Sequence, residues 1–371
     1  MILAGIGEKQ FLRKYWQQQP VLLRQAFPEF VDPISPEELA GLACETDVDA
    51  RLVFTRGQHW QLKSGPFAER DFTSLPKRNW TLLVQAVDQW VPEVKALLAS
   101  VPFLPSWRVD DVMISYATPN GGVGPHFDYY DVFLVQGRGS RIWKTGQRCT
   151  AVDELRTDSG LKLLKQFDTE QEWELHSGDV LYVPPGVAHW GTSIDNSLCY
   201  SIGFRAPSVG DMVLGFSDEI AAQLGTDLRF NDPARRLPLN AGEITAADLG
   251  KVKALLLDAL HDDAALARWF GTQMTQPRYP DLIQPIQHRG RTGTALVSLH
   301  ASSRMAWQQE AGSLRVFVDG ESEVLKDSPT LRQCLQRLCN GQAVAMAQLM
   351  KRRDVAVWSQ RLLEHGSLLP A

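Results

Sequence analysis

The sequence has few cysteines, no long apolar run and no excess of basic residues, and each shortage argues against a class of protein. Five cysteines are scattered over 371 residues without a CxxC pair, which fits free thiols in a reducing cytosol rather than a disulfide framework. No stretch reaches the roughly 18 apolar residues that a membrane-spanning helix requires. The N-terminal segment lacks the charged and apolar regions of a signal peptide, so we expect a cytoplasmic protein without membrane contact.

Basic residues are in the minority. The chain has 38 Lys and Arg against 43 Asp and Glu, a net charge of −5 and a pI of about 5.9. Nucleic-acid binding depends largely on neutralising phosphates, so we expect no direct nucleic-acid recognition. A mildly acidic surface instead suits a basic protein substrate. The hydrophobic share of 44% is ordinary for a globular protein, and the length allows two or three domains.

Two blocks in the middle of the chain carry the residues of a metal site. The first is GGVGPHFDYYDVF, residues 121–133, a glycine-rich turn entering an apolar strand that contains His126 and Asp128. Residues at i and i+2 of a strand point to one face, so this spacing aims both side chains at one point. The second is GDVLYVPPGVAH, residues 178–189, in which a turn, a short buried strand and a proline turn precede His189.

We therefore predict His126, Asp128 and His189 as ligands of one metal ion. Two imidazoles and one carboxylate can hold Fe(II) on one face and leave the opposite coordination positions open. Zinc could use the same three residues with a bound water. Iron is favoured because the barrel context and a candidate co-substrate anchor accompany the ligands. His176 is the nearest competitor, but it precedes the turn that opens the second block and is expected at the surface.

An Fe(II) centre with three protein ligands can bind a bidentate acid such as 2-oxoglutarate and then dioxygen. The distal carboxylate of that acid requires a buried cation, and arginine offers fixed bidentate geometry. Arg141 follows the turn GRGS, where a hairpin would return the chain toward the barrel interior. Lys144 ranks second because it alternates to the other face of the strand, and Ser115 could donate a hydroxyl to the same carboxylate.

Strand alternation also places Asp111, Met113 and Ser115 on one face. If Ser115 faces the barrel interior, Asp111 and Met113 line its mouth. A carboxylate beside an aromatic ring, here Asp111 with Tyr130, could hold a guanidinium by a charge-assisted hydrogen bond and stacking. A surface aspartate and a core methionine remain the alternative interpretation.

The pattern of short apolar runs and turns predicts an α+β protein with a double-stranded β-helix, or jelly roll, between Val109 and Arg205. The best predicted strands are 112–116, 131–136, 141–144, 180–183 and 198–204. Upstream we expect helices at 8–19 and 92–100, strands at 21–24 and 80–85, and a helix that starts with Ser35 as N-cap.

After Pro207 the pattern becomes helical. Helices are predicted at 210–224, 249–257 (behind a capping box at Thr245) and 264–270, and such apolar helices need a partner surface, either the barrel or a second subunit. Residues 279–291 resemble a linker. The remainder mixes strands at 295–299, 314–318 and 323–325 with helices at 330–338 and 355–365. This mixture could be a winged helix, and because it lacks a strongly basic recognition helix we expect partner docking rather than DNA reading.

The motifs HFDYYDVF, GDVLYVPPGVAHWG and YSIGFRAP, with Arg141 fifteen residues after His126, resemble the JmjC-type 2-oxoglutarate oxygenases. Within that group they resemble the bacterial ribosomal oxygenases, also at WQQQPVLLRQAF and DPISPEELAGLA near the start, and the resemblance weakens after about residue 290. It implies a cupin-like JmjC jelly-roll domain at 1–207, a helical dimerisation region at 208–285 and a winged-helix-like domain at 286–371. A homodimer is therefore expected.

The resemblance also implies an activity: Cβ hydroxylation of an arginine in ribosomal protein L-sixteen of the large subunit, with Fe(II) as cofactor and 2-oxoglutarate and O2 as co-substrates. Arg141 would bind the C5 carboxylate of 2-oxoglutarate, with Ser115 assisting. The substrate arginine pocket would comprise Asp111, Met113, Tyr130 and Ser201. Cys199 departs from the family, which carries asparagine there, and this puts in doubt a polar contact near the site rather than the metal set.

Two other functions share the same core. An N-methyl-lysine demethylase would use the same metal chemistry, but the sequence offers no obvious aromatic cage or histone-reader module. A non-enzymatic cupin-like module would bind a partner through the C-terminal region. Succinate formation that depends on His126 would exclude this second alternative.

Overall fold

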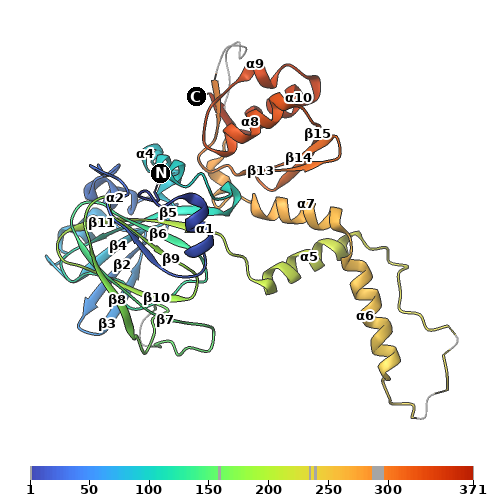
Figure 1. The fold of residues 1–371 in the computed structure, drawn as a ribbon, viewed down its shortest axis with the longest axis horizontal. Helices are drawn as coiled ribbons and strands as arrows, with labels where there is room; N and C mark the ends of the chain where they lie inside the picture. Colours follow the sequence, from blue (N-terminus) through green and yellow to red (C-terminus); the bar gives the residue numbers. More distant parts are fainter. Residues whose placement is uncertain (1, 158–159, 234, 238–239, 286–295, 371) are drawn as a thin grey trace. The chain divides into compact units, whose positions relative to one another are not determined.

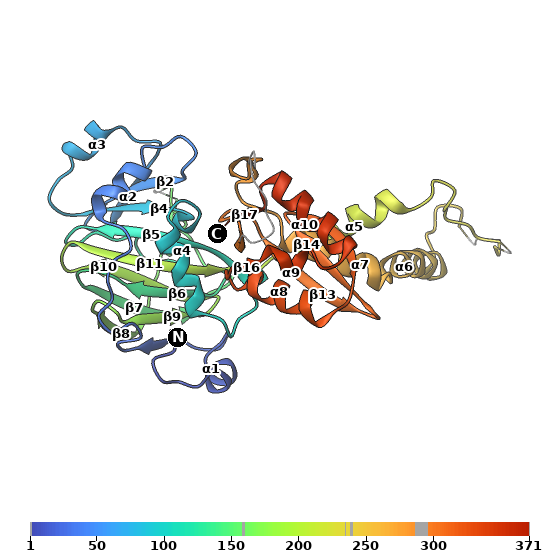
Figure 2. The same ribbon diagram turned by 90° about the horizontal axis from the view of Figure 1, so that it is seen from above.

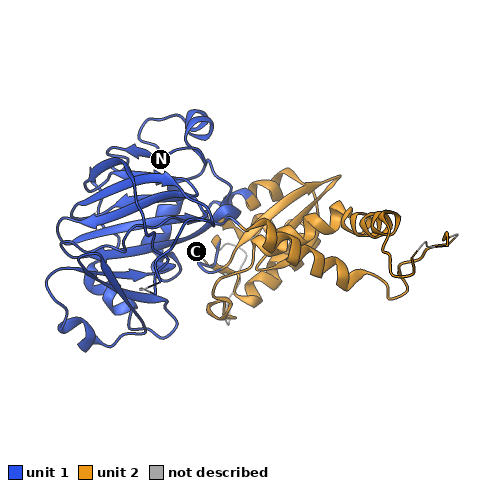
Figure 3. Cartoon of the chain, turned by 90° about the horizontal axis from the view of Figure 1, so that it is seen from below, with its two compact units in different colours: residues 1–206, 298–302, 336–343 blue, residues 207–297, 303–335, 344–371 orange. Residues whose placement is uncertain are grey.

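The computed structural model describes residues 2–157, 160–233, 235–237, 240–285 and 296–370. The chain forms two compact units, coloured separately in Figure 3. The first comprises Met1–Ala206, Ser298–Ser302 and Gln336–Ala343, and the second comprises Pro207–Val297, Ser303–Leu335 and Val344–Ala371. Within the described part of the chain, we find no helix with the length and apolar character needed to cross a membrane.

The first unit contains two antiparallel sheets that form the predicted jelly roll. The large sheet has the order β1-β9-β6-β11-β5-β4-β2-β3, and the small sheet has the order β10-β7-β8. The large-sheet strands are β1 (Val21–Leu23), β2 (Ala50–Arg56), β3 (His59–Ser64), β4 (Trp80–Val84), β5 (Val109–Ala117), β6 (Val132–Gln136), β9 (Val180–Val183) and β11 (Ser197–Phe204). The small-sheet strands are β7 (Arg141–Arg148), β8 (Thr169–Leu175) and β10 (Val187–Ser193).

Helices cover one face of the large sheet, and the small sheet faces the other. The helices are α1 (Glu8–Lys14), α2 (Pro36–Leu42), α3 (Glu69–Thr73) and α4 (Pro92–Lys95), with 3₁₀ turns η1 (Val87–Gln89), η2 (Ala96–Ser100) and η3 (Ser106–Arg108). Figure 1 shows α2 and α4 on one side of the large sheet and β7, β8 and β10 on the other. Figure 2 shows the same strands from above.

Strand β6 is buried on both faces, and its alternate residues belong to two different hydrophobic cores. Phe133 and Val135 belong to the core beneath the helices, whereas Val132 and Leu134 belong to a second core between the two sheets. A strand buried on both faces has no polar alternation, so β6, β9 and β11 appear in the sequence as continuous apolar runs. These three strands and β5 lie where the sequence predicts them.

Tertiary packing corrects the predicted first helix. We expected it to continue to Gln19, but α1 ends at Lys14. Gln17 adopts a left-handed backbone conformation (φ 58°), and its N–H donates to the Tyr182 hydroxyl at 2.7 Å. This hydrogen bond and the packing of Trp16 on Tyr182 outweigh helix propensity. The predicted helix at 92–100 is likewise divided, into α4 and η2.

The second unit contains a helical segment and a mixed segment. Its helices are α5 (Val209–Gln223), α6 (Ala246–Leu260), α7 (Asp263–Met274), η4 (Pro280–Leu282), α9 (Met346–Leu349) and α10 (Arg353–His365). Strands β13 (Met305–Glu310), β14 (Ser313–Val318) and β15 (Glu321–Lys326) form one sheet. A further sheet has the order β16-β12-β17, from Val344–Ala345, Leu296–Leu299 and Leu368–Pro370, and the division into units falls within β12, after Val297. Helix α8 (Pro329–Cys339) contributes residues to both units.

In the second unit, a glycine allows one close helix–sheet contact, and a capping box begins one helix. Gly271 of α7 lies against Phe317, so closely that a Cβ at this position would be 2.3 Å from the ring. The predicted capping box is present, because the Thr245 hydroxyl accepts the N–H of Asp248 and the Asp248 carboxylate accepts the N–H of Thr245. Helix α5 packs on α7 through Phe216 and Trp269. The last part of the predicted linker, 286–291, lies outside the described residues.

Candidate active site

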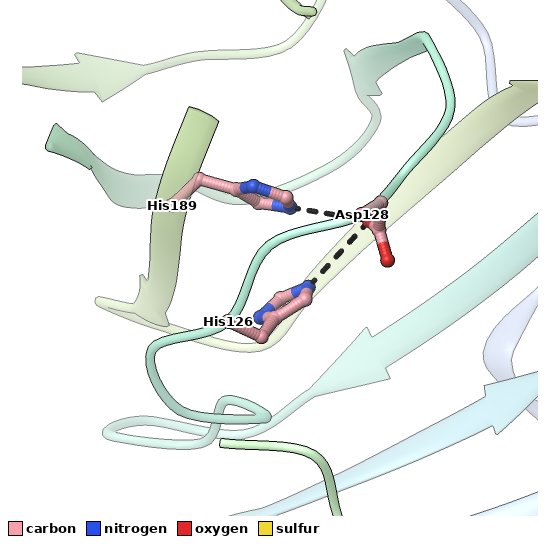
Figure 4. A group of neighbouring side chains, drawn as sticks. All are labelled: His126, Asp128 and His189. Carbon is pink, nitrogen blue, oxygen red and sulfur yellow. Dashed lines mark ion pairs between the residues drawn. The ribbon is translucent and has the colours of Figure 1, made fainter. Parts of the chain in front are cut away.

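His126, Asp128 and His189 converge at one point, as Figure 4 shows. Their nearest ligand atoms all lie within 4.8 Å of one another. A carboxylate oxygen of Asp128 lies 4.0 Å from Nε2 of His126 and 3.6 Å from Nε2 of His189. One carboxylate and two imidazole nitrogens at this spacing form a three-point donor set that a single metal ion can join.

Backbone hydrogen bonds that pair His126 with His189 bring these two ligands together. The N–H of each residue donates to the carbonyl of the other, at 3.1 and 2.8 Å, as in an antiparallel pair. The expected strand through 126–128 is wrong, because only this isolated bridge is regular and β6 begins at Val132. The side chains share a direction because of the bridge to β10 and not because of strand alternation.

Backbone carbonyls also set the orientation of both imidazole rings. Nδ1 of His126 lies 2.9 Å from the carbonyl of Gly124, and Nδ1 of His189 lies 3.0 Å from that of Val187. A carbonyl only accepts, so each Nδ1 carries the proton and each Nε2 keeps its lone pair toward the centre. Burial, followed by the neighbouring His126, lowers the pKa of His189 to about 4. Both effects favour the neutral imidazole that metal binding requires.

Two glycines allow the close approach of the loops at this site. Gly124 has a φ of +88°, and a Cβ there would lie 2.8 Å from the Trp60 ring. Gly186, which ends the double-proline turn with a φ of +77°, donates its N–H to the carbonyl of Asp128 at 2.7 Å. The turn thus fixes the backbone of Asp128.

Arg141 is buried between the two sheets. Its Nε donates to Oγ of Ser197, Nη1 to Oγ of Ser115, and Nη2 to both carbonyls of these serines, at 2.7 to 3.1 Å. In the described part of the chain no carboxylate lies within 4.0 Å of it, and burial lowers its pKa. A desolvated cation without a counter-ion is costly, so the site favours an anionic ligand. Lys144, in contrast, lies on the outer face and pairs with Glu172 at 3.2 Å.

The expected bidentate fork of Arg141 needs revision. A guanidinium has five N–H groups, and four of them are used by the two serines. One N–H on Nη1 and the positive charge are therefore left to an anion. The Ser115 hydroxyl, whose contact with the carbonyl of Cys199 is long at 3.4 Å, is a second donor beside it.

The β7–β10 ladder joins the arginine to the metal ligands. His189 pairs with Thr145, Gly191 with Trp143 and Ser193 with Arg141. Trp143 thus lies midway, and its buried indole N–H has no hydrogen-bond partner in the described structure. Our sequence interpretation missed Trp143, although alternation from Arg141 could have placed it on the same inner face.

The predicted substrate residues lie on β5, on β11 and in the loop that carries Asp128. Asp111 and Ser115 are buried on β5, Met113 pairs in register with Ser201 of β11, and Tyr130 is 42% exposed. Burial and the neighbouring carboxylates, Asp128 first and then Asp111, raise the pKa of Tyr130. Cys199 pairs in register with Ser115. His176 is exposed, as expected, beside Glu174.

A jelly roll that carries two histidines and one aspartate on one side of an open metal position defines a class, the mononuclear iron oxygenases. Two family models match the chain, the JmjC domain over residues 96–212 and the ROXA-like winged helix over residues 258–368. The ribosomal protein uL16 3-hydroxylase of Escherichia coli is 40% identical over 282 residues, 74% of this chain and 73% of that protein. The chain belongs to the JmjC-type ribosomal oxygenases, which are 2-oxoglutarate-dependent.

Solved structures extend the similarity to the whole chain. A structure of E. coli YcfD matches with a TM-score of 0.88 at 30% identity, covering 99% of this chain and 98% of that one. A structure of YcfD described as a ribosomal oxygenase in complex with cobalt and 2-oxoglutarate matches with a TM-score of 0.85 at 31% identity, with the same coverage. The jelly roll and the winged-helix domain expected from the sequence are therefore confirmed.

Proposed function

We propose that this enzyme hydroxylates Cβ of an arginine in the ribosomal protein uL16. The observation that carries the proposal is that a buried carboxylate, Asp111, and the carboxylate of the metal-ligand set, Asp128, both neighbour the Tyr130 side chain. A guanidinium fits this chemistry through a charge-assisted hydrogen bond and stacking. The acidic net charge of −5 also suits a basic ribosomal protein.

The donor set fits Fe(II) and 2-oxoglutarate. His126, Asp128 and His189 would hold the metal, and Arg141 with Ser115 would hold the C5 carboxylate of the co-substrate. When bound, iron and 2-oxoglutarate would activate dioxygen for C–H hydroxylation: one oxygen atom would enter the substrate C–H bond and the other would enter succinate, formed with CO2 from 2-oxoglutarate. The carbonyl contact of each Nδ1 orients Nε2 of both histidines, so we expect little rotation of the two imidazoles when metal binds.

The remaining residues position the substrate and exclude water. Asp111 would pair with the guanidinium, Tyr130 and Met113 would pack on it, and the Ser201 hydroxyl would donate or accept a hydrogen bond. The proposed chemistry requires no acid or base from the protein, whose contribution would be to hold one C–H bond at the reacting centre.

The test is the intact mass of purified uL16 after incubation with the enzyme, Fe(II), 2-oxoglutarate and air. We expect a gain of one oxygen atom on an arginine, which His126→Ala abolishes. Succinate release that depends on His126 without any gain on uL16 would exclude the substrate and keep the oxygenase. Loss of a methyl group from a methyl-lysine peptide would favour the demethylase instead.

We also propose a three-part chain, with the catalytic domain at 1–207, a dimerisation region at 208–285 and a docking domain at 286–371. Helix α6 supports the dimer because none of its residues is buried. Leu249, Val252, Leu256 and Leu260 follow helical spacing and are all exposed. An isolated helix of 15 residues is marginal in water, so this stripe requires a partner, and a second copy supplies the same stripe.

Light scattering after size-exclusion chromatography tests the dimer. We expect a mass of twice 41.5 kDa and a shift toward the monomer in Leu256→Asp. The control Ala247→Asp places the same charge on the opposite side of α6 and should remain dimeric. A monomeric wild type would overturn the dimer without affecting the catalytic proposal. Cytoplasmic location and the absence of nucleic-acid recognition stay part of the proposal.

A further inference from the structure

The Asp111 carboxylate is held by a neighbouring strand. Gln85 directly follows β4, and its Nε2 donates to Oδ2 of Asp111 at 2.7 Å. The Oε1 of the same amide accepts from Nη2 of Arg51 at 3.1 Å. The backbone N–H of Gln85 donates to the carbonyl of Asp49 at 2.9 Å, which fixes the chain at this point. Arg51, Gln85 and Asp111 thus form a continuous hydrogen-bonded row.

Arg51 decides which way the amide points. An arginine side chain has only donors, so the amide must turn its oxygen toward Arg51 and its nitrogen toward Asp111. Reversal would place the NH2 group against the guanidinium and the carbonyl oxygen against the carboxylate, two repulsive contacts. Arg51 also forms an ion pair with Asp49, whose carboxylate lies 3.7 Å from its Nε.

Because Gln85 is neutral, its contact with Asp111 adds no positive charge beside the carboxylate. A lysine or arginine in direct contact with Asp111 would neutralise the carboxylate and compete with a cationic substrate. The amide supplies a donor of fixed direction and carries no charge itself, so this contact does not offset the charge of the Asp111 carboxylate. Arg51 stays one residue further away.

We infer that Gln85 is a positioning residue for the substrate arginine: it orients Asp111 without neutralising it, and Arg51 sets the direction of its amide. The inference rests on the proposed arginine pocket. Gln85 acts through Asp111, so its loss affects substrate binding and leaves the metal and 2-oxoglutarate sites intact.

The experiment measures binding of purified uL16 to the enzyme loaded with Mn(II) and 2-oxoglutarate under argon. We expect Gln85→Met to weaken uL16 binding by about tenfold, the order expected for one hydrogen bond to a charged group. Gln85→Lys should weaken it by a further order of magnitude because it pairs with Asp111. Arg51→Met should give a smaller loss, since the amide keeps its length but loses its fixed direction.

Two readouts separate this role from a structural one. Affinity for 2-oxoglutarate should stay near wild type in Gln85→Met, and the thermal midpoint should fall by no more than a few degrees, because only the two hydrogen bonds of the amide are lost. If instead the midpoint falls while uL16 affinity is unchanged, Gln85 only supports the end of the strand and the inference is wrong. Asp111→Asn is the reference variant. If it weakens uL16 binding and Gln85→Met does not, the positioning role fails alone, whereas no effect of Asp111→Asn overturns the arginine pocket itself.

Discussion

Replacing Arg141 by methionine tests the co-substrate site most directly. Methionine keeps much of the length and removes the charge from a site where the guanidinium has no carboxylate partner in the described structure. An anion that binds there loses a buried charge partner, a change of about 3 kcal/mol or more, which corresponds to at least ~100-fold weaker 2-oxoglutarate binding. Arg141→Lys keeps the charge but cannot make all four serine contacts, so we expect a loss of about tenfold.

Calorimetric titration of the Mn(II)-loaded protein with 2-oxoglutarate under argon measures both variants. Metal affinity serves as the internal control, because Arg141 lies four strand positions from the residue that pairs with His189. Circular dichroism shows whether the methionine variant folds, since it leaves the carbonyls of Ser115 and Ser197 without their donor. A folded Arg141→Met that binds 2-oxoglutarate within twofold of wild type would refute the assignment.

Three further predictions follow from buried groups. Trp143→Phe keeps a ring but removes the unpartnered N–H, so 2-oxoglutarate binding by the same titration should weaken about threefold to tenfold; no change would make the indole a packing residue only. Gly191→Ala should destabilise the fold by about 1–3 kcal/mol in urea, because its Cβ would lie 2.8 Å from the Trp143 ring. Burial raises the pKa of Asp88 to about 7. The folded state therefore binds this proton more tightly, and stability falls as pH rises from about 4 to about 7. Asp88→Asn should then be more stable than wild type at pH 8, by up to ~4 kcal/mol, and similar at pH 4; equal stability at both would contradict the raised pKa.

Strands could be predicted from the sequence where the local pattern of apolar residues matches their burial in the fold. Strands buried on both faces, such as β6 and β9, have apolar runs with clear turns on either side. The metal ligands were recognisable because residue type and order carry the chemistry, independent of how the backbone brings them together. The reason given for their convergence was nonetheless incorrect, since His126 meets β10 through an isolated bridge.

Other parts of the site depend on contacts that no local pattern contains. Strand β8 carries Glu170, Glu172 and Glu174 on an exposed face, so its apolar content is too low for a strand to be predicted. Strand β10 was missed because glycine and histidine interrupt it. Gln85 gains a role only through Asp111 and Arg51, which lie on two neighbouring strands. Pairing between strands must be known before such residues can be found.

The register between β7 and β10 explains why these separate features form one site. Every second residue of β7 faces inward, and the ladder sets Thr145, Trp143 and Arg141 opposite His189, Gly191 and Ser193. The backbones of Arg141 and of Thr145, the partner of His189, are thereby four strand residues apart, or ~13 Å. A slip of one residue would turn Arg141 outward, to the face where Lys144 now pairs with Glu172. Gly191 gives room for the Trp143 ring in this register, because a Cβ at that position would lie 2.8 Å from the ring.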